Sequence, residues 1–315
     1  MVINNRTEFS KSKILTKKRK LLVILTLIII LILFFFGTIF LFFLPYYKEI
    51  KGAYEISIYL LIGTIIIIIR IVVLIVLGYV LFKKWILHEE SHYMDIPFLL
   101  GIFSYIFIWG KVLDIISDII YVNIKYLGNF SELFLLNIVK LRVVIGTVNM
   151  FPIFLIGVYF YFFRRSLKKE VSQKEKNARK NTIIFLIFFF TSTSIIYFFL
   201  HNIQYISFLS GIVSLSGFSL LIWVFFTAYK GKILPEIRSL IVSIGFMLLL
   251  FFNVLYSILM GLFSDVQISS EIIAYLSTGS AAIIYYTTEG GNLVAIIIIL
   301  IGFEKKATYY KNFLK

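Results

Sequence analysis

The sequence predicts an all-α fold, a polytopic bundle of about eight transmembrane helices, and three observations carry this prediction. Of the 315 residues, 60% are hydrophobic and only 15% are charged. Apolar runs of roughly 20 residues or more, long enough to cross a bilayer, recur along the chain. The segments between these runs are short and polar. This composition exceeds what the core of a soluble domain needs.

The chain begins with a basic segment, residues 1–20, and the apolar run after it is too long for a signal peptide and lacks a small-residue cleavage site. We therefore predict an uncleaved first helix. The predicted spans are 21–44, 56–82, 96–122, 143–163, 182–200, 205–227, 239–263 and 273–303. The last segment, 304–315, is again basic and interleaves tyrosines with lysines, as an interfacial helix does.

Three predicted spans have distinctive surroundings. Before the fourth span, apolar residues from Phe130 to Leu141 follow helical spacing, so we expect an amphipathic lead-in that lies in the membrane interface. The fifth and sixth spans are separated only by residues 201–204, which predicts a tight helical hairpin. We find no internal repeat in the sequence, although many transporters contain one.

The placement of basic residues predicts the orientation. With the N-terminus inside, the inner segments hold 24 of the 31 Lys and Arg residues and the outer segments hold 5. This asymmetry predicts that both termini are cytoplasmic. The expected partners of these basic residues are the lipid bilayer and the anionic head groups at its cytoplasmic surface. The formal net charge of +15 therefore does not indicate a nucleic-acid-binding protein.

The longest loop, residues 164–181, is a basic connector of almost entirely polar residues, and an acidic cytoplasmic protein is a possible partner for it. The chain has no cysteine. Disulfides, thiolate metal sites and cysteine nucleophiles are therefore excluded.

Charged residues inside the predicted spans form the candidate site. Lys111, Asp114 and Asp118 follow i, i+3, i+7 spacing, so they share one face of the third span. One charge at the bilayer centre costs roughly 2.5–3.5 kcal/mol on insertion scales. This face must therefore meet partners, a cavity or water.

Depth along each helix predicts which charges meet. At 1.5 Å per residue from the cytoplasmic end, Arg70, Lys111 and Glu289 lie in one layer, roughly 18 to 22 Å deep. Side chains lean towards the N-terminus of their helix, which brings Arg70 and Asp114 together, and we predict an ion pair between them. Such a pair is as consistent with fixing helix register as with function.

Two further polar positions complete the predicted site. Asn292 follows Glu289 on the same stripe of the eighth span, and Asn149 lies in the fourth span, beside Pro152. The pair Gly290-Gly291 either unwinds the eighth span, as in discontinuous transporter helices, or permits close helix packing.

The charges in this layer suggest a function. Two cations face three acids, Asp114, Asp118 and Glu289, which leaves one negative charge for a proton or a bound cation to balance. We therefore predict a non-enzymatic transporter or receptor-like sensor for a small polar or ionic ligand, with no cofactor. A structural membrane subunit whose charges only register helices is an alternative.

A second alternative comes from a cytoplasmic loop. The pattern His88-Glu89-x-x-His92 resembles the H-E-x-x-H signature of zinc metallopeptidases. This resemblance implies that His88 and His92 bind zinc and that Glu89 acts as general base. Against it, no third ligand stands out and these loops are too short for a substrate cleft. A polar extension of the second helix explains the same residues.

Overall fold

The computed structural model describes residues 17–87, 93–166, 173–200, 203–234, 237–263 and 279–304. Every regular element in these residues is a helix, which confirms the all-α prediction for the described part of the chain. The helices are α1 (Lys17–Thr38), the short π-helical segment η2 (Ile39–Phe43), α2 (Tyr47–Ile56), α3 (Ile58–Leu87), α4 (Ile96–Tyr126), α5 (Glu132–Ser166), α6 (Gln173–Phe199), α7 (Ile203–Lys230), α8 (Ser239–Phe263) and α10 (Gly279–Glu304).

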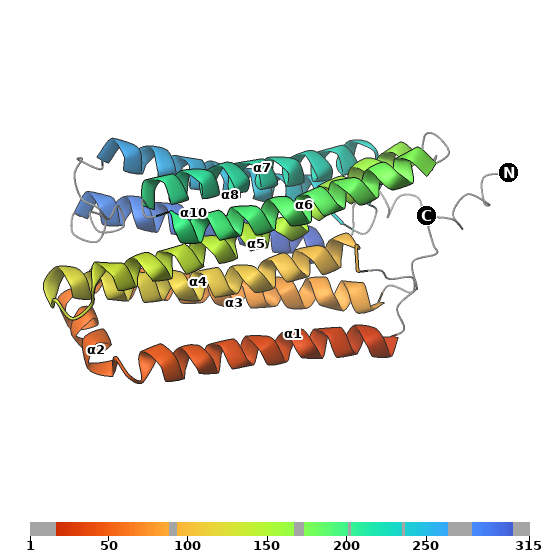
Figure 1. Cartoon of the computed structure of the whole chain (residues 1–315). Helices are drawn as coiled ribbons and strands as arrows, with labels where there is room; N and C mark the ends of the chain where they lie inside the picture. Colours follow the sequence, from red (N-terminus) through yellow and green to blue (C-terminus); the bar gives the residue numbers. More distant parts are fainter. Residues whose placement is uncertain are drawn as a thin grey trace.

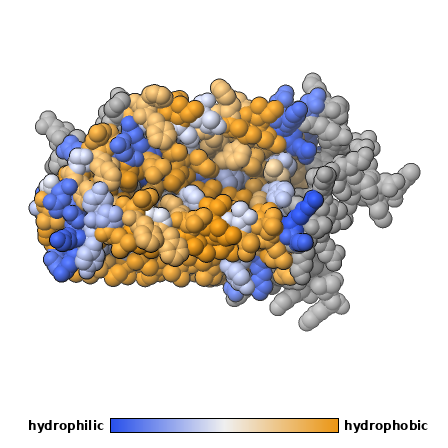
Figure 2. Space-filling model, turned by 60° about the horizontal axis from the view of Figure 1, so that its bottom comes forward, coloured by the Kyte–Doolittle hydropathy of each residue, from blue (hydrophilic) through white to orange (hydrophobic). Residues whose placement is uncertain are grey.

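Seven helices of the described residues are long and apolar enough to cross a membrane. They are α1 with η2, α3, α4, α5, α6, α7 and α10, and α8 holds a shorter apolar stretch, Ser239–Leu255. Figure 2 shows the matching surface, in which hydrophobic side chains cover most of the middle and hydrophilic side chains gather towards both ends. An apolar belt of this kind indicates an integral, multi-pass membrane protein.

The long helices run back and forth along one axis (Figure 1). The start of α1 and the end of α10 lie at the same end of the bundle, and the short helix α2 lies at the opposite end. Six helices form a closed ring, in which α3 packs on α4, α4 on α5, α5 on α7, α7 on α8, α8 on α10 and α10 on α3. Helix α6 packs outside this ring, on α5.

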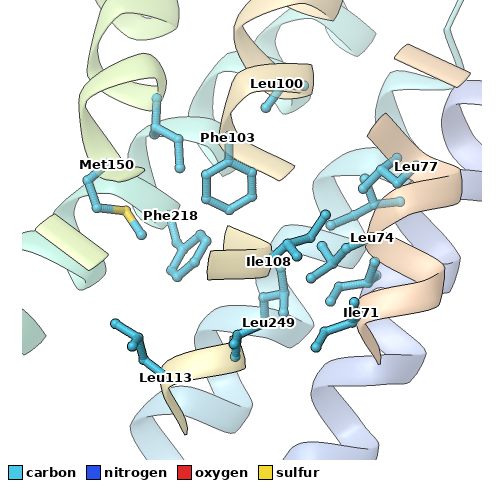
Figure 3. Close-up of a cluster of buried hydrophobic side chains, with 14 of the residues drawn as sticks. Ile71, Leu74, Leu77, Leu100, Phe103, Ile108, Leu113, Met150, Phe218 and Leu249 are labelled. Carbon is cyan, nitrogen blue, oxygen red and sulfur yellow. The ribbon is translucent and has the colours of Figure 1, made fainter. Parts of the chain in front are cut away.

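Apolar side chains fill the interior of the ring, as Figure 3 shows. Phe103 of α4 and Phe218 of α7 meet edge to face with ring centroids 6.3 Å apart. Phe218 in turn stacks on Phe246 of α8, 6.4 Å away. Leu74 and Leu77 of α3 line the same region, and both are buried. The ring therefore encloses a packed core at this level.

Helix α1 lies at the periphery. Most of its large apolar side chains are exposed, as expected for a helix surrounded by lipid. Its contacts with α4 are few and specific: the Tyr105 hydroxyl donates a hydrogen bond to the Leu27 carbonyl, and Phe34 stacks on Trp109 with ring centroids 4.6 Å apart.

The start of α5 differs from the prediction. The helix begins at Glu132, so the residues predicted as an interfacial lead-in belong to the same continuous helix as residues 143–163. Two basic residues near this start have partners in the bundle. Lys140 is buried and donates to the Phe198 carbonyl at 3.0 Å, in the last turn of α6, where carbonyl groups lack helical partners. Arg142 binds an acid of α4.

Candidate functional site

Glu289 of α10 lies between two cations. Its Oε1 is 3.0 Å from Nζ of Lys111 in α4, and its Oε2 accepts a hydrogen bond from Nη1 of Arg70 in α3. The Arg70 side chain is 1% exposed and that of Glu289 is 12% exposed. Both positions fall near the middle of their helices, and Arg70 has apolar residues on either side along the chain. Three helices of the ring thus meet through a buried carboxylate.

The ion pairs continue from Lys111 to a fourth helix. Nζ of Lys111 is also 2.7 Å from Oδ2 of Asp114, one turn later in α4. Oδ1 of Asp114 is 2.7 Å from Nε of Arg142 in α5. The five charged side chains Arg70, Glu289, Lys111, Asp114 and Arg142 form one continuous series of ion pairs, which we call the ion-pair chain.

The predicted ion pair between Arg70 and Asp114 is wrong. The structure pairs Arg70 with Glu289, because α10 closes the ring against α3 and brings Glu289 to the Arg70 guanidinium. Asp114 is held instead by Lys111 of its own helix and by Arg142. Depth alone could not distinguish two acids that lie in neighbouring layers.

The predicted charge balance also changes. Arg142 adds a third cation, so three cations now match the three acids Asp114, Asp118 and Glu289. The prediction that one negative charge is left over therefore loses its basis. Arg142 was not predicted as part of the site because it falls in a predicted outer loop. Its spacing of seven residues from Asn149 places both residues on one face of a helix, and this spacing could have indicated its role.

Asp118 lies beside the ion-pair chain, two turns after Lys111. Its Oδ2 accepts a hydrogen bond from the Tyr285 hydroxyl of α10, at 3.1 Å. Near this pair, the hydroxyl groups of Tyr54 in α2 and Thr64 in α3 are 3.1 Å apart. The pKa of Tyr54 is raised, first by burial and to a smaller extent by the negative charge of Asp118. Polar groups therefore continue from the ion-pair chain towards α2.

Phe107 of α4 lies on the other side of the cations. Cζ of Arg70 is 4.9 Å from the centroid of its ring, and Nζ of Lys111 is 6.0 Å away. An aromatic face attracts cations at such distances. Beyond Phe107, towards the start of α4, the buried residues Phe103 and Leu100 lead into the apolar core (Figure 3). The charges are thus flanked by polar groups on one side and by apolar groups on the other.

The two predicted asparagines lie apart from these ion pairs. Asn149 of α5 and Asn292 of α10 are both buried, and neither Oδ1 atom has a hydrogen-bond partner among the described residues. A buried amide oxygen without a partner is unusual. Asn292 is one turn from Glu289, so it faces the same side of α10.

Gly290 and Gly291 do not unwind the helix. Helix α10 continues through both residues. A Cβ atom at Gly291 would lie 2.4 Å from the ring of Phe252 in α8, whereas one at Gly290 would meet nothing within 4 Å. Close packing of α8 on α10 therefore explains Gly291, and the alternative of a discontinuous helix is wrong.

The zinc alternative is not addressed by these contacts. His88, Glu89 and His92 lie outside the described residues, and within the described ranges no group of three His, Asp or Glu side chains is arranged to hold a metal ion.

We expect the detergent-purified protein to hold no stoichiometric zinc. Elemental analysis tests this, with His92→Ala as the control: about one zinc per chain, lost in that variant, would favour the metallopeptidase.

The basic connector 164–181 is described only in part, since residues 167–172 lie outside the described ranges. Its second half belongs to α6, and Arg165 at the end of α5 pairs with Glu175 in α6, with 2.6 Å between Nε and Oε1. A cytoplasmic protein partner for this connector stays a prediction.

Comparison with known proteins gives no family. No model of a known protein family matches the chain, and neither a curated protein nor a solved structure shows significant similarity to it. The ion-pair chain and its surroundings are therefore the features that point to a function.

Proposed function

We propose that the protein transports a small ionic solute and that the ion-pair chain is its binding site. One observation carries this proposal: five charged side chains from four helices join in a single series, and all of them except Arg142 are largely buried near the middle of long apolar helices. Charged groups at membrane depth are costly, and they commonly mark the path of a solute or an ion.

A purely structural role explains this arrangement less well. Well-packed apolar residues often replace a buried ion pair at no cost to stability, and one pair is enough to fix the register of two helices. Here Lys111 bridges two acids and Asp114 bridges two cations. Shared partners of this kind can be exchanged with a charged ligand, because Lys111 and Asp114 each keep one partner when they lose the other.

The surroundings support access from one side. Towards α2 the ion-pair chain is followed by Asp118, Tyr285, Thr64 and Tyr54. Towards the opposite end, the apolar core of the ring separates it from water. The distribution of basic residues favours a cytoplasmic location for the start of α1 and the end of α10 (Figure 1). The polar side of the site then faces outward.

Single-cysteine labelling tests this access. The chain has no cysteine, so Thr64→Cys on the polar side and Ser104→Cys on the apolar side each introduce one thiol. Both are hydroxyl residues of the ring, and they lie on opposite sides of the charged layer because α3 and α4 are antiparallel. We expect an impermeant thiol reagent to modify Thr64→Cys and to leave Ser104→Cys unmodified. Equal labelling of the two variants would contradict one-sided access.

Flux tests the transport itself. Proteoliposomes are screened with radiolabelled organic anions, amino acids and organic cations. We expect the wild-type protein to take up at least one of these classes, and we expect Glu289→Gln to abolish this uptake. Binding without uptake would instead favour a receptor-like sensor. If Glu289→Gln and Asp118→Asn both leave binding and uptake unchanged, the ion-pair chain is not the site.

A further inference from the structure

The three acids of the site have unequal partners. Glu289 and Asp114 each contact two cations, and these contacts use Arg70, Lys111 and Arg142. Asp118 has no Lys or Arg nitrogen within 4.0 Å among the described residues, and the hydroxyl of Tyr285 is its hydrogen-bond partner. Asp118 is therefore the one acid of the three whose protonation breaks no ion pair.

The groups that surround Asp118 are either ion-paired or tyrosines. Asp114 is one turn earlier on the same face of α4, so its negative charge disfavours a second one there. The charged and titratable groups that face this region are Tyr54 of α2, Arg70 of α3, Lys111 and Asp114 of α4, Arg142 of α5, and Tyr285, Tyr286 and Glu289 of α10. The five charged groups of this set are ion-paired with one another, and the remaining three are tyrosines.

The state of Asp118 thus sets the charge of the site. The ion-pair chain has three cations and two acids, so it carries one net positive charge. With Asp118 ionised the whole site is neutral, and with Asp118 protonated the charge of +1 is uncompensated. A buried site disfavours net charge, so the protonated site favours one monovalent anion.

We propose that the protein binds a proton at Asp118 together with a small monovalent anion at the ion-pair chain. This proposal rests on the proposed transport function and specifies it as cotransport of a proton with an anion. The Arg142 guanidinium is the cation that an entering anion meets first, since its side chain is 40% exposed and those of Arg70 and Lys111 are buried. Guanidinium groups suit carboxylates and other oxyanions because they donate hydrogen bonds in a planar fork.

Proton and anion binding must then be linked. If one proton binds with each anion, lowering the pH by one unit raises the anion affinity by up to about tenfold, and adding the anion causes proton uptake. The empty site with Asp118 ionised and the occupied site with Asp118 protonated are the two neutral states. A transporter that passes between these two states carries no net charge across the membrane.

The test measures anion binding to the full-length protein in lipid nanodiscs at several pH values. The probes are the sodium salts of chloride, nitrate, formate and lactate at constant ionic strength, and calorimetry gives both affinity and protons taken up. We expect at least one anion to bind more tightly as the pH falls, with uptake of up to about one proton per chain. Asp118→Asn, which imitates the protonated acid, should bind the same anion at all pH values with no proton uptake.

Control variants and contrary outcomes separate the two proposals. Glu304→Gln changes an exposed acid at the end of α10 and should leave the pH dependence as in the wild type. Binding of none of these anions, an affinity that does not change with pH, or a pH dependence that persists in Asp118→Asn would each overturn the proton–anion proposal. Linked binding without uptake into proteoliposomes would support linked proton and anion binding and overturn transport. Uptake without pH linkage would support transport and overturn the linkage.

Discussion

Glu289→Gln is expected to destabilise the protein more than any other single change in the ion-pair chain. The substitution keeps the size of the side chain and removes the negative charge between Arg70 and Lys111. Lys111 keeps Asp114, but the buried Arg70 guanidinium loses its acid. Removing one partner of a buried pair costs about 3–5 kcal/mol, because a charge stays buried without compensation. Chemical unfolding of the purified protein should show a loss of this size.

A matched control and a rescue separate this cause from a general effect of the substitution. Glu304→Gln makes the same chemical change at an exposed position of the same helix and should leave the unfolding free energy almost unchanged. Arg70→Met in the Glu289→Gln background removes the uncompensated cation, so the double variant should be more stable than Glu289→Gln alone. Equal stability of Glu289→Gln and Glu304→Gln would show that the pair contributes little.

The contacts of Glu289 also show which part of the site can be predicted from the sequence. Rise per residue was enough to predict that Arg70, Lys111 and Glu289 lie in one layer, and Glu289 contacts both of the other side chains in the structure. Which acid binds which cation depends on the order of helices around the ring. That order comes from tertiary packing, here α10 against α3, and periodicity within single helices carries no information about it.

Arg142 illustrates a different limit. Counting basic residues between apolar runs treats each of them as a loop residue, which is sound for the cytoplasmic segments. At the start of α5 it failed, because Lys140 and Arg142 form part of the helix and their charges are satisfied by the Phe198 carbonyl and by Asp114. Only the partners on α6 and α4 show that these charges belong to the bundle.

The short helix α2 was missed for a related reason. Residues 45–55 are too few and too polar to resemble a membrane span, so the sequence predicts an outer segment there, whereas the structure has a helix over Tyr47–Ile56. In the structure this helix places Tyr54 beside Thr64 at the polar side of the site. Spacing within apolar runs therefore predicts the charged layer more readily than the polar groups between this layer and α2.

The second large effect is expected at Gly245, where the backbone of α10 lies close to α8. A Cβ atom at this position would lie 2.5 Å from Cγ1 of Ile299, and 3.1 Å from both the Ala295 oxygen and the Ile299 nitrogen of the backbone. A side chain can rotate away from such a contact, but a helix backbone has to move. At Gly302, a Cβ atom would in the same way lie 3.1 Å from the backbone nitrogen of Val242.

Gly245→Val should therefore separate α8 from α10 and lower the unfolding free energy by about 3 kcal/mol, the upper end of the range for overpacked interiors. The matched control is Gly146→Val in α5, where a Cβ atom would meet nothing within 4 Å, and its effect should be small. Because α10 carries Glu289, moving this helix also pulls the carboxylate away from Arg70 and Lys111. Glu289→Gln should then lower the unfolding free energy less in the Gly245→Val background than in the wild type. Strictly additive losses in chemical unfolding would show that the glycine contact and the ion-pair chain are independent.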